Sequence, residues 1–128
     1  MQNSVVAFSF SALLLCPVAA LAQEGDAEAG AVVFKKCATC HVVEEDTNKV
    51  GPSLKGVLGR TAGTHPDFRY SPAMVKAGEE GLVWDEAALR DYLQNPRAKV
   101  KGTKMVFPGL KKEDEITNLI AYLKQYPK

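Results

Sequence analysis

Two of the three cysteines of the chain and one of its two histidines lie within the stretch KCATCH, Lys36–His41. Cys37 and Cys40 are separated by two residues, and His41 follows directly. This C-x-x-C-H pattern is typical of covalent c-type haem attachment. The spacing suits that chemistry, because two thiols can add across the two vinyl groups of one porphyrin while the adjacent imidazole reaches the iron. The pattern therefore predicts one haem c, with His41 as an axial ligand.

Other uses of two closely spaced cysteines fit less well. In an exported protein, two cysteines would normally suggest a disulfide between them. A disulfide would leave the adjacent His41 without a role. A redox-active dithiol of the thioredoxin kind usually follows a strand, whereas Cys37 follows a helical pattern. A structural zinc ion requires two more ligands nearby, and the chain has only His65 left to offer. Haem attachment accounts for all three residues of the motif.

The second axial ligand has three candidates, His65, Met74 and Met105. Met105 is favoured because GTKMVFPG places it in a loop bounded by glycine and proline, far downstream of His41. Met74 falls inside a predicted helix, where packing is the expected role, and His65 precedes Pro66 in a polar loop, where a surface position is expected. A thioether favours ferrous iron and raises the reduction potential. Two filled axial positions leave the iron able to exchange an electron, which indicates a carrier and not an enzyme.

The N-terminal segment Met1–Ala22 carries no charge, is apolar over most of its length and ends in the triplet ALA. These features predict a secretory signal peptide cleaved before Gln23, and residues 23–128 then form one domain in the periplasm. The segment lacks the usual basic n-region, so an uncleaved membrane anchor stays open as an alternative. A lipoprotein anchored through Cys16 is disfavoured because Leu15 is bulky.

Helical spacing of apolar residues dominates the remainder of the chain, and no alternating strand pattern is present. The fold class is therefore all-α, with three to five short helices and long loops. Loops of this length in a small domain need a function, and a buried macrocycle around which they wrap would supply one. The predicted helices run from Asp26 through the attachment site, from Ser71 to about Lys76, from Asp85 to Asn95, and over Ile116, Leu119, Ile120 and Leu123 to a stop at Pro127.

From about Gly25 to Tyr126 the sequence resembles the class I c-type cytochromes, in the branch of bacterial cytochrome c2 and mitochondrial cytochrome c. The resemblance is carried by GDAEAGAVVFKKCATCH, KVGPSLKGVLGR, FRYSPAM, the tryptophan at 84, LRDYLQNPRAKVKGTKMVFPGL and LIAYLK. Together these are far more specific than the attachment motif alone. They imply the cytochrome c fold around one covalently bound haem.

The resemblance also implies a role for each matching residue. Cys37 and Cys40 would form the thioether bonds. His41 would be the proximal iron ligand and Met105 the distal one. Pro52 would offer its carbonyl to the other ring nitrogen of His41, a bond that orients a ligating histidine and increases its donation.

Further residues are implied around the haem. Tyr92 and Thr103 would border the distal side. Arg60, Tyr70 and Trp84 would hydrogen-bond or offset the propionates, because a buried charge without a partner is costly. The resemblance further implies close packing where the first and last helices cross, between Gly30 and Phe34 on one and Leu119 and Tyr122 on the other.

The formal net charge is only +1, from 16 basic and 15 acidic residues, so the distribution of charge decides the choice of partner. A lysine-rich face around the haem edge would steer an acidic docking surface. The resemblance implies a monomeric carrier between a cytochrome bc complex and a terminal oxidase or photosynthetic reaction centre. The alternative is a haem subunit of a peroxidase or dehydrogenase system. Nucleic acid is not expected, because no aromatic residues interleave a basic patch. The basic residues that flank the attachment motif and the Met105 loop are Lys35, Lys36, Lys49, Arg97, Lys99, Lys101, Lys104, Lys111 and Lys112.

Overall fold

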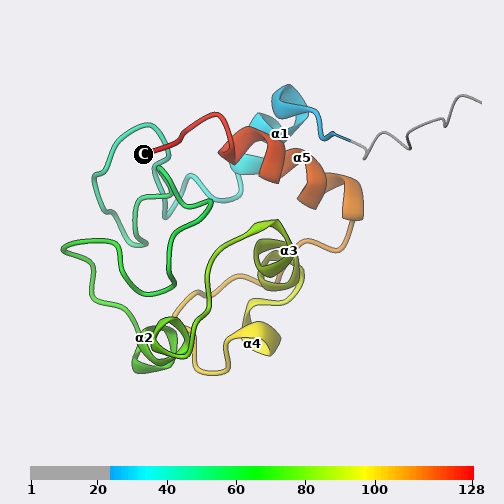
Figure 1. Cartoon of the computed structure of the whole chain (residues 1–128). Helices are drawn as coiled ribbons and strands as arrows, with labels where there is room; N and C mark the ends of the chain where they lie inside the picture. Colours follow the sequence, from blue (N-terminus) through cyan, green and yellow to red (C-terminus); the bar gives the residue numbers. More distant parts are fainter. Residues whose placement is uncertain (1–23) are drawn as a thin grey trace, which may run out of the picture.

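The computed structural model describes residues 24–128, and the predicted signal peptide lies outside the described residues. Over residues 24–128 the chain forms helices joined by long loops, with one isolated antiparallel bridge between Thr61 and Val83 (Figure 1). None of the helices in this range combines the length and apolar character needed to cross a bilayer. The helices are α1 (Ala27–Phe34), α2 (Pro72–Glu79), α3 (Glu86–Gln94), α4 (Pro96–Lys99) and α5 (Glu113–Leu123). The all-α prediction is confirmed.

Helix α1 begins where Asp26 accepts hydrogen bonds from the backbone N–H groups of Glu28 and Ala29. It ends at Phe34, which corrects the prediction that this helix carries the attachment motif at its own end. After Phe34 the backbone tightens, because Lys36 and Cys37 bond to carbonyls three residues back, at 3.0 and 2.7 Å. The motif therefore lies on turns that follow the helix.

Helix α2 starts as predicted, with the Ser71 hydroxyl accepting from the Met74 N–H at 3.1 Å and Pro72 in the first turn. It continues to Glu79, beyond the predicted end near Lys76. The extension is possible because Gly78 is a glycine: a Cβ at this position would lie 1.9 Å from the Ala62 carbonyl oxygen. The last turn of α2 thus packs directly on the backbone of the preceding loop.

Helix α4 was not predicted, because Asn95-Pro96 was interpreted only as the end of the preceding helix. In the structure Asn95 is both the C-cap of α3 and the N-cap of α4. Its side chain accepts from the Ala98 N–H at 3.2 Å, and Pro96 takes the first helical position. One Asn-Pro pair therefore ends one helix and starts the next.

The first and last helices cross closely, as the resemblance implies. A Cβ on Gly30 would lie 2.0 Å from the Asn118 carbonyl oxygen, so only glycine permits this approach. The rings of Phe34 and Tyr122 pack with centroids 5.2 Å apart. The Asp26 N–H donates to the Asn118 side chain at 2.9 Å. These contacts join chain segments that are remote in sequence.

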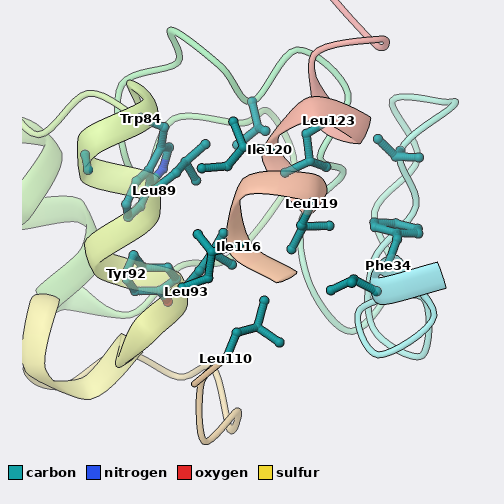
Figure 2. Packing of buried hydrophobic residues seen from close by; sticks show 14 of the residues in the cluster. Phe34, Trp84, Leu89, Tyr92, Leu93, Leu110, Ile116, Leu119, Ile120 and Leu123 are labelled. Atoms are coloured by element: carbon teal, nitrogen blue, oxygen red, sulfur yellow. The ribbon is translucent and has the colours of Figure 1, made fainter. Parts of the chain in front are cut away.

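Helix α5 lies between α1 and α3 and carries much of the core (Figure 2). Ile116 and Leu119 are the largest fully buried side chains, at 0% and 1% exposure. The helix ends at Leu123, earlier than the predicted stop at Pro127. From there the C-terminal residues run back over the loop that follows the attachment motif (Figure 1), and the Tyr126 carbonyl accepts from the Gly56 N–H at 2.7 Å.

Candidate functional site

Cys37 and Cys40 lie on a single turn and are not joined in a disulfide. The N–H groups of Cys40 and His41 both bond to the Cys37 carbonyl, at 3.0 and 2.9 Å. Both thiols are partly exposed. Burial raises the pKa of the Cys37 thiol to about 11, against the opposing charge of Lys36. A redox dithiol needs a depressed thiol pKa, so the environment of Cys37 disfavours that alternative.

The imidazole of His41 is oriented by the residues just downstream. Its Nδ1 lies 2.7 Å from the Pro52 carbonyl oxygen. A carbonyl only accepts, so Nδ1 carries the proton and Nε2 is left as the lone-pair nitrogen. Burial lowers the pKa of His41, with the Pro52 bond opposing this effect and the Lys49 charge adding to it. The ring is thus a neutral donor with one free nitrogen, as an iron ligand must be.

Glycine is required beside this ring. A Cβ built on Gly51 would lie 2.4 Å from Cε1 of His41 and 2.7 Å from Nδ1. The Gly51 N–H also donates to the Cys40 carbonyl at 2.8 Å, and Lys49 Nζ donates to the Ala38 carbonyl at 2.9 Å. The loop therefore holds the attachment turn along its length.

Met105 lies in the loop between α4 and α5, half-buried against the core. Its N–H donates to Thr103 Oγ1 at 3.3 Å, and Thr103 Oγ1 lies 2.8 Å from the Tyr92 hydroxyl. Burial raises the pKa of Tyr92, and the bond to Thr103 opposes this shift. The structure thus brings together the three residues that the resemblance places on the distal side. The next residue, Val106, is 87% exposed, so the loop tip faces solvent.

The other two candidates for the distal position are engaged elsewhere. Met74 is 8% exposed inside α2, which confirms its expected packing role. The expectation that His65 lies at the surface is wrong, because its side chain is only 8% exposed. Its Nδ1 faces the Pro66 carbonyl at 3.1 Å and its Nε2 lies 3.8 Å from Asp46, since the loop folds over the ring.

Arg60 is 7% exposed, and its guanidinium donates to two loop carbonyls, those of Ser53 at 2.8 Å and of Lys55. It forms no ion pair with any residue in the range 24–128. Burial lowers its pKa, which the contact with Tyr70 opposes. A buried cation without an ion pair is costly, and an anionic propionate would relieve that cost. The residue therefore fits a haem.

The remaining predicted propionate partners, Tyr70 and Trp84, are both packed in aromatic pairs. The Tyr70 hydroxyl accepts from the His65 N–H at 3.2 Å, and its ring meets Phe68 edge-on with centroids 4.8 Å apart. Trp84 is 7% exposed and lies 4.9 Å from the Tyr92 ring. Trp84 therefore connects to the distal side through Tyr92.

Sequence reasoning missed two residues that shape the proximal loop. Asn48 accepts from the Ser53 N–H at 3.0 Å and donates to the Pro66 carbonyl at 2.9 Å. Ser53 is fully buried, with its hydroxyl bonded to the Glu45 carbonyl. An asparagine in a polar turn is a recognisable signal for such bonds, but its partners are distant enough that the sequence did not identify them.

Comparisons with known proteins agree with this geometry. The cytochrome c family model matches residues 27–127. Cytochrome c2 of Agrobacterium tumefaciens (strain II Chrys) is 54% identical over 101 residues, covering 78% of this chain and 91% of that protein. Cytochrome c-550 of Nitrobacter winogradskyi is 48% identical, covering 81% of this chain and 94% of that protein. Among solved structures, cytochrome c2 from Rhodospirillum centenum has a TM-score of 0.78 at 42% identity, covering 81% of this chain and all (100%) of that one.

Proposed function

The chain belongs to the cytochrome c family, and on this premise we propose that it carries single electrons through the periplasm, from a cytochrome bc complex to a terminal oxidase or photosynthetic reaction centre. It is a monohaem electron carrier and not an enzyme, and its cofactor is covalently attached haem c. When bound, the haem iron accepts and gives up one electron. The chain's residues attach the haem, ligate it and shield it from side reactions.

The observation that carries this proposal is the bond from His41 Nδ1 to the Pro52 carbonyl, beside two free thiols on the same turn. We assign Cys37 and Cys40 to the thioether bonds and His41 Nε2 to the iron. A hydrogen-bonded imidazole is held in one tautomer and is a stronger donor. Reorganisation on electron transfer is then small, because the ligand is already in place.

Met105 is assigned as the residue that would hold the iron together with His41. Its backbone is bonded through Thr103 to the Tyr92 hydroxyl, so the loop that carries the thioether is anchored next to Met105. If His41 and Met105 both hold the iron, no site on it would be left for oxygen or peroxide. Arg60, Tyr70 and Trp84 are assigned to the propionates, and Arg60 is the cation among them.

Docking is assigned to the exposed surface around the Met105 loop. Val106, which follows Met105 in the chain, is 87% exposed and gives this surface an apolar residue. The surrounding lysines and Arg97 are exposed as well. Three of the lysines there are held by backbone carbonyls, Lys49 by that of Ala38, Lys104 by that of Arg69 and Lys111 by that of Gln94. A basic rim of this kind raises the encounter rate with an acidic partner.

The test is electron transfer with isolated membranes of the source organism. The purified haem-loaded protein should be reduced by the quinol-oxidising complex and reoxidised by the membranes in the presence of oxygen or light. Lys101→Glu should slow both steps several-fold at low ionic strength, with the difference lost at high salt. Lys76→Glu, on the exposed face of α2, is the matched charge control and should leave both rates unchanged.

If Lys101→Glu and Lys76→Glu slowed electron transfer equally, the assigned docking surface would be wrong. If the membranes did not reduce the unchanged protein, the proposed donor would be wrong. The mass of the protein recovered from the periplasm tests the location. A chain starting at Gln23 with one haem supports it, whereas a full-length chain in the membrane fraction supports the anchored alternative.

A further inference from the structure

We propose that Arg60 is a positioning residue for His41, acting through the backbone of residues 52–55. This role adds to its assignment as a propionate partner, and it rests on the proposed function in that His41 must be the iron ligand. The residues involved are contiguous: the Pro52 carbonyl accepts from His41, and the next carbonyl, that of Ser53, accepts from Arg60 Nη1 at 2.8 Å. Arg60 Nη2 donates to the Lys55 carbonyl.

The guanidinium can act as a fixed point because Arg60 is itself anchored. Its N–H donates to the Val57 carbonyl at 3.0 Å, and its carbonyl accepts from the Trp84 N–H at 2.9 Å. The side chain is buried, so water does not compete for its donors. Its rigid planar fork can hold two carbonyls at once, which a lysine ammonium on a flexible stem does less well.

Other residues also hold the backbone of residues 52–55, but they do so mainly through different groups from those that Arg60 holds. The Ser53 N–H is held by Asn48 at 3.0 Å and the Leu54 N–H by the Val42 carbonyl at 2.8 Å. These contacts hold donors of the segment. Among its acceptors, the Leu54 carbonyl is held by the Val57 N–H at 3.1 Å, and the Ser53 and Lys55 carbonyls are held by Arg60. The Pro52 carbonyl and the Ser53 N–H belong to one peptide unit, so with the Ser53 and Lys55 carbonyls released this unit keeps its bond to Asn48 but loses the support of the next carbonyl, and it can tilt about that bond. The Pro52 carbonyl then moves away from His41.

The consequence for the site follows from the strength of the His41–Pro52 bond. A weaker bond makes the imidazole a poorer donor, which favours ferrous iron and raises the reduction potential. Loss of a positive charge beside the haem has the opposite sign, because it favours ferric iron. The two roles of Arg60 are therefore separable by a variant that keeps the charge.

Arg60→Lys is that variant. In the haem-loaded protein, NMR should show the His41 Nδ1–H exchanging with water about tenfold faster than in the unchanged protein, the factor expected for loss of one hydrogen bond's net stabilisation. The reduction potential should rise. Lys55→Ala is the matched control: it removes a neighbouring charge but keeps the carbonyl that Arg60 holds, so the His41 exchange rate should not change.

A His41 Nδ1–H exchange rate that is unchanged in Arg60→Lys would overturn the proposal, whatever the potential does. If that variant fails to fold, the unchanged protein decides instead: its Arg60 Nη protons should be slowly exchanging and lie close to Ser53 and Lys55, and freely exchanging Nη protons would equally overturn the inference. A failure of the proposed function can be distinguished from a failure of this inference. In that case the NMR spectrum of the unchanged haem-loaded protein would show that His41 is not bound to the iron.

Discussion

Gly30 of α1 and Asn118 of α5 meet backbone to backbone, so closely that a Cβ on the glycine would lie 2.0 Å from the asparagine carbonyl oxygen. The neighbouring Tyr122 Cβ would be 2.8 Å away, so the added methyl has no direction in which to move. Gly30→Ala must therefore force α1 and α5 apart. We expect it to lower the free energy of unfolding by about 3 kcal/mol, at the upper end for overpacking.

Urea unfolding of the haem-loaded protein measures this loss. Val32→Ala is the control on the same helix, because Val32 is 62% exposed and its truncation should change stability by less than about 0.5 kcal/mol. A Gly30→Ala protein as stable as the Val32→Ala protein would mean that the helices do not cross at this glycine.

Gly51 supports a prediction about the site itself. A Cβ there would lie 2.4 Å from Cε1 of His41, and an imidazole held by the iron and by Pro52 cannot swing away. Gly51→Ala should lower the stability of the haem-loaded protein by about 1–3 kcal/mol and shift its absorption spectrum. The control is Val50→Ala, because Val50 is 76% exposed. An unaltered spectrum and stability for Gly51→Ala would show that the ring lies elsewhere.

Tyr92 and Thr103 should be energetically coupled, because the Tyr92 hydroxyl lies 2.8 Å from Thr103 Oγ1. Tyr92→Phe and Thr103→Val each remove one partner. In a double-mutant cycle on unfolding free energy we expect a coupling of about 1 kcal/mol. Thr103→Val should also weaken the ferric absorption feature of the Met105–iron bond, because it removes the acceptor of the Met105 N–H. Strict additivity in the cycle would argue against the bond.

Ionisation of Tyr92 should contribute to the pH dependence of the free energy of unfolding. Burial raises the pKa of its phenol above the usual value of about 10. The folded state thus keeps a proton that the unfolded state loses, so this group's contribution is fully present below about pH 10 and is lost as pH rises towards the folded pKa. Unfolding free energies between about pH 8 and 11 should fall more steeply for the unchanged protein than for Tyr92→Phe. Parallel curves would exclude Tyr92 as the group responsible.

The sequence was sufficient for the parts of the molecule that depend on local pattern. The pattern places the starts of three helices at Asp26, Ser71 and Asp85, and the side chain of each accepts the bond that caps its helix. Local pattern also misled at Asn95, because the same residue that ends α3 caps α4. A dipeptide that stops one helix carries no sign that another begins.

Contacts between loop residues that are distant in the sequence were harder to predict. Nothing in the local pattern indicates that the His65 side chain is covered, because Asp46 and Asn48 reach its loop only once the chain has folded back. The same holds for Arg60, whose carbonyl partners are set by the loop path. What pattern alone does not encode is which backbone acceptors a buried side chain will meet.

The crossing of α1 and α5 has a consequence for biogenesis. The bond from the Asp26 N–H to Asn118 spans 92 positions of the chain. A polypeptide still emerging from the ribosome lacks the residues that complete this pairing, and contacts at such long separation form slowly. The packing of α1 against α5 therefore cannot form before α5 has been made, and until then the KCATCH segment that follows α1 lacks the support of this crossing.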